Sequence, residues 1–393
     1  FSMTPLPSDI AHIVGQIYPL GRQHLAEALA REARALYWIG AIVSLGVLTA
    51  TFFGGTAARV RYSLERRIRQ PFALAATYVA LLMLAFSLLS LPLEFYGSFT
   101  LSHRFGLSDE AVTRWLRDWS VGTVIDAAIA AVIGALLLRA IARFRRWPLI
   151  AVLAAGPLIF FGSAIYPLWV APLFNTYRPL PPSPLSNAIL RLAHEQGLNA
   201  AVVYEYDMSA QTHEANAYVA GLGATERIAV GDTLLRSMKP DEVLYVMAHE
   251  IGHYKLKHLW IGSLEGWAGA AVAIAWLSLA GNVILRSCPR RARSLADPAA
   301  AVLLAFLALI FQVVTAPASN ALSRQIEHAA DVFAAQHTQL GDAGVRCFAR
   351  LANLDLSVLH PPRLVVWYFY THPPTDERIL YAAQAQKPAA AAP

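Results

Sequence analysis

Two histidines and a glutamate in the stretch VMAHEIGHYKLKH, residues 246–258, have the spacing of a metal-dependent hydrolytic site. In a helix, His249 and His253 project from one face, so their nitrogens can hold one metal ion. Glu250 is offset enough to reach a metal-bound water without ligating the ion, which is the H-E-x-x-H arrangement of zinc peptidases. The alternative is a helix that carries three polar residues by chance. His258 is explained by the favourable interaction of histidine with a helix C-terminus.

A catalytic zinc site needs a third protein ligand and one open position. Leu256 and Leu259 stand where the pattern H-E-x-x-H-x-x-G-x-x-H requires glycine and histidine, which excludes that class of site. A second candidate segment is NALSRQIEHAADVFAA, residues 320–335, in which Glu327 could ligate zinc. Asp331 shares its helix face and could accept a hydrogen bond from a ligand histidine. On spacing alone, a solvated helix carboxylate explains Glu327 equally well.

The chain that must position these residues is very apolar. Its 393 residues are 56% hydrophobic and 15% charged, whereas a soluble domain carries about 25% charge. Asp126 and Glu265 fall within apolar segments. Either they face a polar interior between the helices, or they are core groups paired with a polar neighbour. Six segments are long enough to cross about 30 Å of hydrocarbon as helices, at residues 35–55, 72–93, 120–138, 147–173, 259–285 and 299–320. Three prolines predict that the fourth is kinked or ends early.

The polar remainder predicts a mixed domain built around the H-E-x-x-H helix. Strands are expected at 200–206, 216–221 and 227–232, and helices at 184–197 and 240–258. The expected fold is mainly α, a polytopic membrane protein with a gluzincin-type zinc peptidase domain that contains a small β-sheet. The expected parts are an amphipathic segment 1–34, spans one to four in 35–173, the H-E-x-x-H region 174–258, spans five and six in 259–320, and a C-terminal peptidase part 321–393.

Arginines predict the orientation of the chain in the membrane. Loops 56–71, 139–146 and 286–298 are arginine-rich and fall on one side if six spans alternate. The positive-inside rule makes that side cytoplasmic and places the peptidase regions on the periplasmic side of a bacterial inner membrane. The net charge of +6 therefore indicates membrane topology, and nucleic acid is not an expected partner. Cys288 and Cys347 give no metal spacing and no disulfide framework.

Ordered blocks through most of the chain resemble the M48 membrane zinc metallopeptidases, which are the Ste24-type CAAX prenyl proteases and their bacterial relatives. The blocks are HRFGLS (103–108), APLFNTYRPL (171–180), NAYVAGLG (216–223), RIAVGDTLL (227–235), EVLYVMAHEIGHYKLKH (242–258), NALSRQIEHAADVFA (320–334) and THPPTDERI (371–379). H-E-x-x-H followed across two apolar spans by S-R-Q-x-E-x-x-A-D is far more specific than H-E-x-x-H alone. The resemblance implies membrane helices around a water-filled chamber with the metal site at one end.

The resemblance also implies a role for each metal-site residue. One Zn²⁺ would be held by His249, His253 and Glu327. Glu250 would act as general base and then as general acid. Asp331 would support a ligand histidine from outside the metal's own ligand set.

Further roles are implied for residues outside the metal-ligand set. Asn216 and Ala217 would belong to an edge strand that binds the substrate backbone. His372 would donate to the developing oxyanion, and Arg378 would structure the site. The alternatives are that His372 is an ordinary turn histidine and that Arg378 is a surface charge. The family's basic, serine-rich stretch is replaced here by MSAQTHEANAY (208–218), and six spans are expected where eukaryotic members have seven.

The sequence thus predicts an integral-membrane, zinc-dependent endopeptidase. Its substrates would be membrane-associated or lipidated, CAAX-like proteins or peptides, and its other partners membrane lipids. A non-catalytic, zinc-stabilised scaffold or transporter is one alternative. A structural zinc site has four protein ligands, whereas three convincing ligands and an intact Glu250 favour an open catalytic position. An intramembrane site-2-type protease is the other, but the polar residues Tyr254, Lys255 and Lys257 follow the motif.

Overall fold

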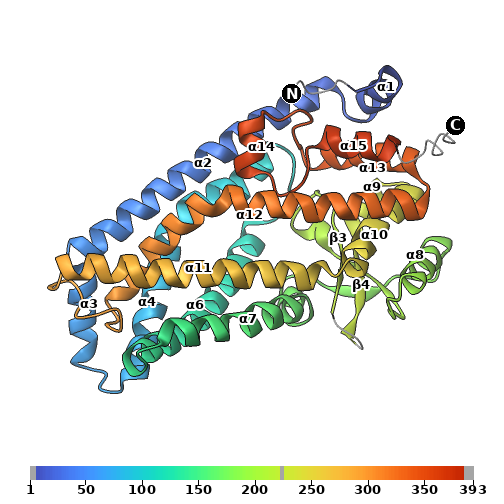
Figure 1. Cartoon of the computed structure of the whole chain (residues 1–393). Helices are drawn as coiled ribbons and strands as arrows, with labels where there is room; N and C mark the ends of the chain where they lie inside the picture. The colour runs from blue at the N-terminus through green and yellow to red at the C-terminus, as the bar shows by residue number, and fades with distance from the viewer. Residues whose placement is uncertain (1–5, 222–224, 385–393) are drawn as a thin grey trace, which may run out of the picture.

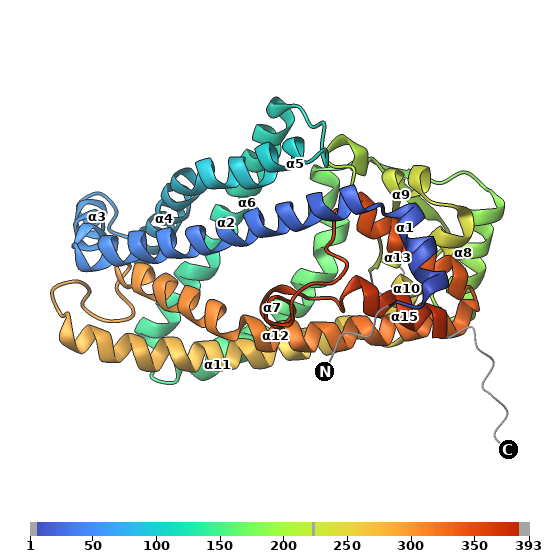
Figure 2. The same cartoon turned by 90° about the horizontal axis from the view of Figure 1, so that it is seen from above.

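Long helices run along the molecule, while a small sheet and several short helices gather at one end (Figures 1 and 2). The computed structural model describes residues 6–221 and 225–384. Six helical segments are long and apolar enough to cross a membrane: Leu20–Phe53, Pro71–Arg104, Val112–Arg143, Trp147–Leu173, His258–Ser287 and Ala300–Thr338. The mainly helical, polytopic membrane fold expected from the sequence is confirmed.

Two long helices extend beyond the predicted spans. Helix α2 (Leu20–Phe53) includes the last part of the segment 1–34, because no proline interrupts it. Helix α12 (Ala300–Thr338) continues through Pro317, well past the predicted end at residue 320. The sixth span and the candidate ligand Glu327 therefore belong to one continuous helix. Helix α7 (Trp147–Ile165) ends early, as its prolines predict, and a π-helical turn (Tyr166–Val170) follows it.

Shorter helices connect the spans and build the peptidase end. A second π-helical segment, Phe95–Thr100, follows the fourth helix. The remaining helices are α1 (Ser8–Ile17), α3 (Thr56–Glu65), α4 (Pro71–Glu94), α5 (Leu101–Arg104), α6 (Val112–Arg143), α8 (Pro184–Glu195), α9 (Asp232–Ser237), α10 (Pro240–Lys255), α11 (His258–Ser287), α13 (Gly341–Leu354), α14 (Arg363–Phe369) and α15 (Thr375–Gln384).

The described strands form one four-stranded sheet in the order β1-β2-β4-β3. Strands β1 and β2 are antiparallel, β2 and β4 parallel, and β4 and β3 antiparallel. The strands are β1 (Tyr177–Pro179), β2 (Val203–Tyr206), β3 (Ala217–Ala220) and β4 (Arg227–Gly231). The three predicted strands are confirmed as β2, β3 and β4 with narrower bounds. Strand β1 was not predicted, because prolines dominate the sequence around it. Strand β3 lies at an edge of the sheet.

Helix α10 is held by an apolar face and by a buried ionic contact. Val243, Met247 and Ile251 recur every four residues and are almost completely buried in the core of the peptidase end. Glu242, which is fully buried, accepts hydrogen bonds from Arg350 Nε at 2.9 Å and Arg346 Nε at 3.3 Å. Both arginines come from α13, so α10 is fixed in position and in rotation about its axis.

Glycine allows α10 to approach α12 closely. A Cβ atom at Gly252 would lie 2.9 Å from Cδ1 of Phe333 on α12, which is closer than side chains normally approach.

Two residues after α10 ends, Lys257 adopts the left-handed conformation with φ 58°, which is uncommon for a residue other than glycine. The chain turns there, and α11 begins at His258 rather than continuing α10.

The three arginine-rich loops meet at the end of the molecule opposite the sheet (Figure 1). Arg61 Nε lies 3.5 Å from Asp297 Oδ1, and Arg293 pairs with Glu65, so the loop after α11 is tied to α3. This arrangement agrees with the predicted grouping of the loops, while the side of the membrane stays a prediction. Asp126 is exposed and Glu265 half-buried. Neither pairs with another described residue, which disagrees with the explanation of paired core groups.

Replacing Gly252 tests whether the close approach of α10 to α12 is required. Gly252→Val should lower the free energy of unfolding by about 1–3 kcal/mol, because the added side chain overpacks the contact with Phe333. Thermal unfolding of the purified protein in detergent measures this. Gly269→Val is the matched control, since nothing lies within 4 Å of a Cβ there. Equal melting temperatures for the two variants would contradict the packing argument.

Candidate metal centre

Three side-chain atoms from two helices converge on one point. His249 Nε2 lies 3.0 Å from His253 Nε2 and 3.2 Å from Glu327 Oε2, and the third separation, from His253 Nε2 to Glu327 Oε2, is 3.5 Å. Tetrahedral zinc with bonds of about 2.0–2.1 Å would separate its ligand atoms by about 3.3 Å. Two imidazoles and one carboxylate are also a donor set that zinc accepts. The three residues therefore fit a zinc ion in both distance and chemistry.

A buried ion pair orients the first histidine. His249 Nδ1 lies 2.9 Å from Oδ1 of Asp331, which leaves Nε2 facing the centre. Arg378 donates from Nε to Asp331 Oδ2 at 2.9 Å and from Nη2 to Oδ1 at 2.7 Å. The guanidinium also stacks 4.3 Å from the ring of Phe348. The predicted partners Asp331 and Arg378 are thus brought together, and the carboxylate fixes the imidazole as outer partners of metal ligands do.

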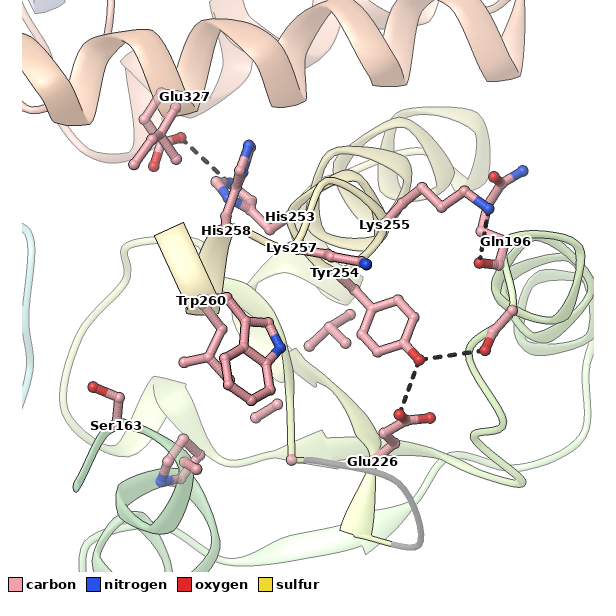
Figure 3. A pocket seen from close by; sticks show the side chains of 18 residues that line it. Ser163, Gln196, Glu226, His253, Tyr254, Lys255, Lys257, His258, Trp260 and Glu327 are labelled. Atoms are coloured by element: carbon pink, nitrogen blue, oxygen red, sulfur yellow. Dashed lines mark hydrogen bonds and ion pairs between the residues drawn. The ribbon is translucent and has the colours of Figure 1, made fainter. Parts of the chain in front are cut away.

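A third histidine orients the second one, a contact that the sequence did not reveal. His258 Nδ1 lies 2.8 Å from His253 Nδ1, and the His258 ring is buried at the start of α11 (Figure 3). If His253 presents Nε2 to a metal, its Nδ1 carries the proton and donates to His258. The explanation of His258 as a histidine at a helix C-terminus is wrong, because Lys257 turns the chain and His258 begins a new helix.

Glu250 and His372 lie at the same centre. Burial raises the pKa of Glu250, while the neighbouring His249 and His253 act to lower it. A partly buried carboxyl group with a raised pKa suits a residue that accepts and then returns a proton. His372 is half-exposed, and its Nε2 lies 3.2 Å from Glu327 Oε2. The structure thus brings His372 to the site, and its role toward an oxyanion stays a prediction.

A cavity of about 670 Å³ opens beside the centre (Figure 3). His253 and Glu327 line it together with Val219 and Ala220 of the edge strand β3. At the start of that strand, the backbone oxygen of Asn216 accepts a hydrogen bond from Gly231 N at 2.8 Å. The side chain of Asn216 is exposed, and Ala217 is buried. The edge strand and the candidate metal ligands therefore border the same space.

Membrane helices with a histidine, histidine and glutamate cluster at one end define an integral-membrane metallopeptidase. The chain belongs to peptidase family M48, whose model matches residues 179–385. The model of the CAAX prenyl protease N-terminal region, described as five membrane helices, matches residues 14–176. Within those residues the described chain has four of the six candidate spans, one fewer than that description.

Individual relatives agree with this assignment. The "Uncharacterized metalloprotease YhfN" of Bacillus subtilis is 31% identical over 373 residues, which cover 92% of this chain and 85% of the relative. A "CAAX prenyl protease 1 homolog" of Arabidopsis thaliana is 28% identical over 300 residues, covering 74% and 68%. The crystal structure of S. mikatae Ste24p superposes with a TM-score of 0.71 at 20% identity, covering 97% of this chain and 100% of that one. That structure shares the fold.

Removing the charge of Asp331 should weaken metal binding. We expect Asp331→Asn to lower zinc affinity by roughly 10- to 100-fold, because the amide holds the tautomer of His249 less firmly. Competition with a chromogenic chelator measures the affinity. The matched control is Asp109→Asn, at a carboxylate that is 89% exposed and contacts none of the candidate metal ligands in the described structure. Unchanged zinc affinity in Asp331→Asn would contradict the orienting role.

Variants of His258 test the contact to His253. His258→Phe should weaken zinc binding by roughly tenfold, because it removes the acceptor for His253 Nδ1. His258→Asn should retain most of the affinity, since its side-chain oxygen can accept at nearly the same place. If both variants bind zinc equally, whether weakly or tightly, His258 does not position His253.

Proposed function

We propose that the protein is a zinc-dependent endopeptidase that cleaves membrane-associated or lipidated, CAAX-like proteins and peptides. One observation carries this proposal. The three donor atoms of His249, His253 and Glu327 meet beside Glu250, at a cavity that is also bordered by the edge strand β3. Metal ligands, a base and a surface for an extended peptide are therefore in one place.

The residues of the centre suit the hydrolysis of an amide. His249, His253 and Glu327 would hold one zinc ion, which supplies Lewis-acid chemistry and lowers the pKa of a bound water towards about 7. The Glu250 carboxylate would accept a proton from the attacking water and deliver it to the leaving amide nitrogen. His372 Nε2 would donate to the carbonyl oxygen as negative charge develops there.

The edge strand would hold the substrate in an extended conformation. Strand β3 pairs with β4 on one side, and no other described strand pairs with it on the opposite side. Backbone groups on a free edge can bind an extended peptide of almost any sequence by adding one strand to the sheet. Val219 and Ala220 of this strand line the cavity, and Asn216 and Ala217 at its start would extend the same edge for the substrate backbone.

The class of substrate and the side of the membrane are inferred from relatives and from charge. Several relatives are named CAAX prenyl proteases, which supports a lipidated tail as one kind of substrate. A bacterial protein would more generally meet membrane proteins in quality control or peptide processing. The arginine-rich end lies opposite the centre (Figure 1), which supports, under the positive-inside rule, our proposal of catalysis on the periplasmic side.

Neither alternative function gains support from a specific observation. A structural zinc site would have four protein ligands, and the candidate cluster found among the described residues has three. A site-2-type protease would carry H-E-x-x-H within a span, but α10 is not among the six candidate spans of the described chain. A hydrolytic centre at the end of the spans therefore remains the function that we propose.

The variant Glu250→Gln tests the mechanism. Its kcat on an extended fluorogenic peptide should fall by at least about 100-fold, because the amide cannot accept the proton. Its zinc content should equal that of the unaltered protein, since Glu250 is not a ligand. Glu195→Gln, at an exposed carboxylate on α8, is the matched control. Full activity in Glu250→Gln would refute the mechanism, and absence of zinc from the unaltered protein would refute the metal assignment.

A further inference from the structure

A second cavity lies at the arginine-rich end, far from the metal centre. It has a volume of about 540 Å³ and is bordered by residues 65–69 at and after the end of α3, the first turns of α4, the last turns of α6 and the loop between α11 and α12. Arg69 and Arg139 stand on its wall, and Phe72, Ala135 and Leu138 give it an apolar surface. Two guanidinium groups next to an apolar surface would suit a ligand that is both anionic and apolar.

The acidic residues of this cavity are already neutralised. Glu65 Oε2 lies 3.0 Å from Arg61 Nη1, and Glu65 also pairs with Arg293. Asp297 Oδ2 lies 2.9 Å from Arg293 Nε, and its other oxygen lies 3.5 Å from Arg61. Two carboxylates and two arginines thus balance each other. These pairs fix the wall of the cavity and leave its other arginines to determine the net charge.

Arg69 and Arg139 are the arginines that remain. Within residues 6–221 and 225–384, no acidic side chain lies within ion-pairing distance of either one. Both are exposed at the cavity. Helix α4 begins beside them at Pro71, so the positive end of its dipole adds to their field. Guanidinium groups bind phosphate oxygens with paired hydrogen bonds, which makes a phosphate the anion that fits best.

An exposed apolar stripe continues from Arg139 along α6. Leu136, Val132 and Ile129 lie three, seven and ten residues before Arg139, so all four share one helix face. These three side chains are 54%, 52% and 51% exposed, respectively. The stripe lies on a candidate membrane span, and the described chain leaves its side chains about half uncovered. A free phosphate ion would make no contact with this apolar stripe, whereas an acyl chain attached to the phosphate could lie along it.

We propose that this cavity binds the headgroup phosphate of an anionic phospholipid, with one acyl chain along the α6 stripe. Arg69 and Arg139 contact the phosphate, and Leu136 and Val132 contact the chain. Basic pockets between membrane helices bind anionic headgroups in this way. The orientation proposed above places the cavity in the cytoplasmic leaflet, whose surface carries the negative lipids. The bound lipid would also bridge α4 and α6 at their shared end.

The test uses the full-length protein, purified in a nonionic detergent, and titrated with lipid in mixed micelles. Native mass spectrometry counts the bound lipid, with dioleoyl phosphatidylglycerol as the anionic probe and dioleoyl phosphatidylcholine as the zwitterionic one. We expect the anionic lipid to bind, and the zwitterionic lipid to bind far more weakly. Arg69→Gln with Arg139→Gln should weaken binding of the anionic lipid about 25-fold, at roughly fivefold for each arginine.

The matched control changes two other exposed arginines of the loop that carries Arg69. Arg66→Gln with Arg67→Gln removes the same charge outside the cavity and should leave binding unchanged. The single variant Arg139→Gln should bind about fivefold more weakly, which keeps the test decisive if the double variant fails to fold. Equal binding of the two lipids, or equal loss in the control pair, would overturn the proposal. So would full competition by glycerol 3-phosphate, which would indicate a site for soluble phosphate.

Discussion

The close contact between α10 and α12 is the constraint on which the metal centre depends. Glycine at position 252 lets the two helices approach until Phe333 fills the space beside it. That approach brings Glu327 of α12 to the two histidines of α10. It also allows Asp331 to reach His249, while Arg378 balances the buried carboxylate. A buried charge without such a partner would cost several kcal/mol, so the orienting pair and the helix packing support each other.

The membrane spans place two chemically different ends at opposite sides of the molecule (Figures 1 and 2). Helix α12 carries Glu327 beyond its apolar part, and α11 starts with His258 beside His253. The sixth span therefore carries the candidate ligand Glu327 on its own helix, and the fifth span begins with the histidine that contacts His253. At their far ends the same helices are joined through Arg293 and Asp297, where the arginines gather. Continuous helices thus connect the peptidase end to the end with the basic loops.

The sequence predicted the parts whose signals are local. The pair His249 and His253, the helix start at Pro240 and three of the four described strands follow from spacing and residue type. Glu327 could be proposed only as a candidate until the resemblance to M48 supported it, because two spans separate it from the histidines. His258 was missed, since its contact depends on the left-handed turn at Lys257. The contacts among the arginine-rich loops depend on tertiary packing, which residue spacing does not specify.

Zinc K-edge X-ray absorption on the purified full-length protein tests the central claim most directly, because it reports the ligands themselves. Two imidazoles, the Glu327 carboxylate and one water should give four nitrogen or oxygen neighbours at about 2.0–2.1 Å. The spectrum of Glu250→Gln should show the same protein ligands. Sulfur in the first coordination shell, a fourth protein ligand in place of water, or the lack of stoichiometric zinc would contradict the account.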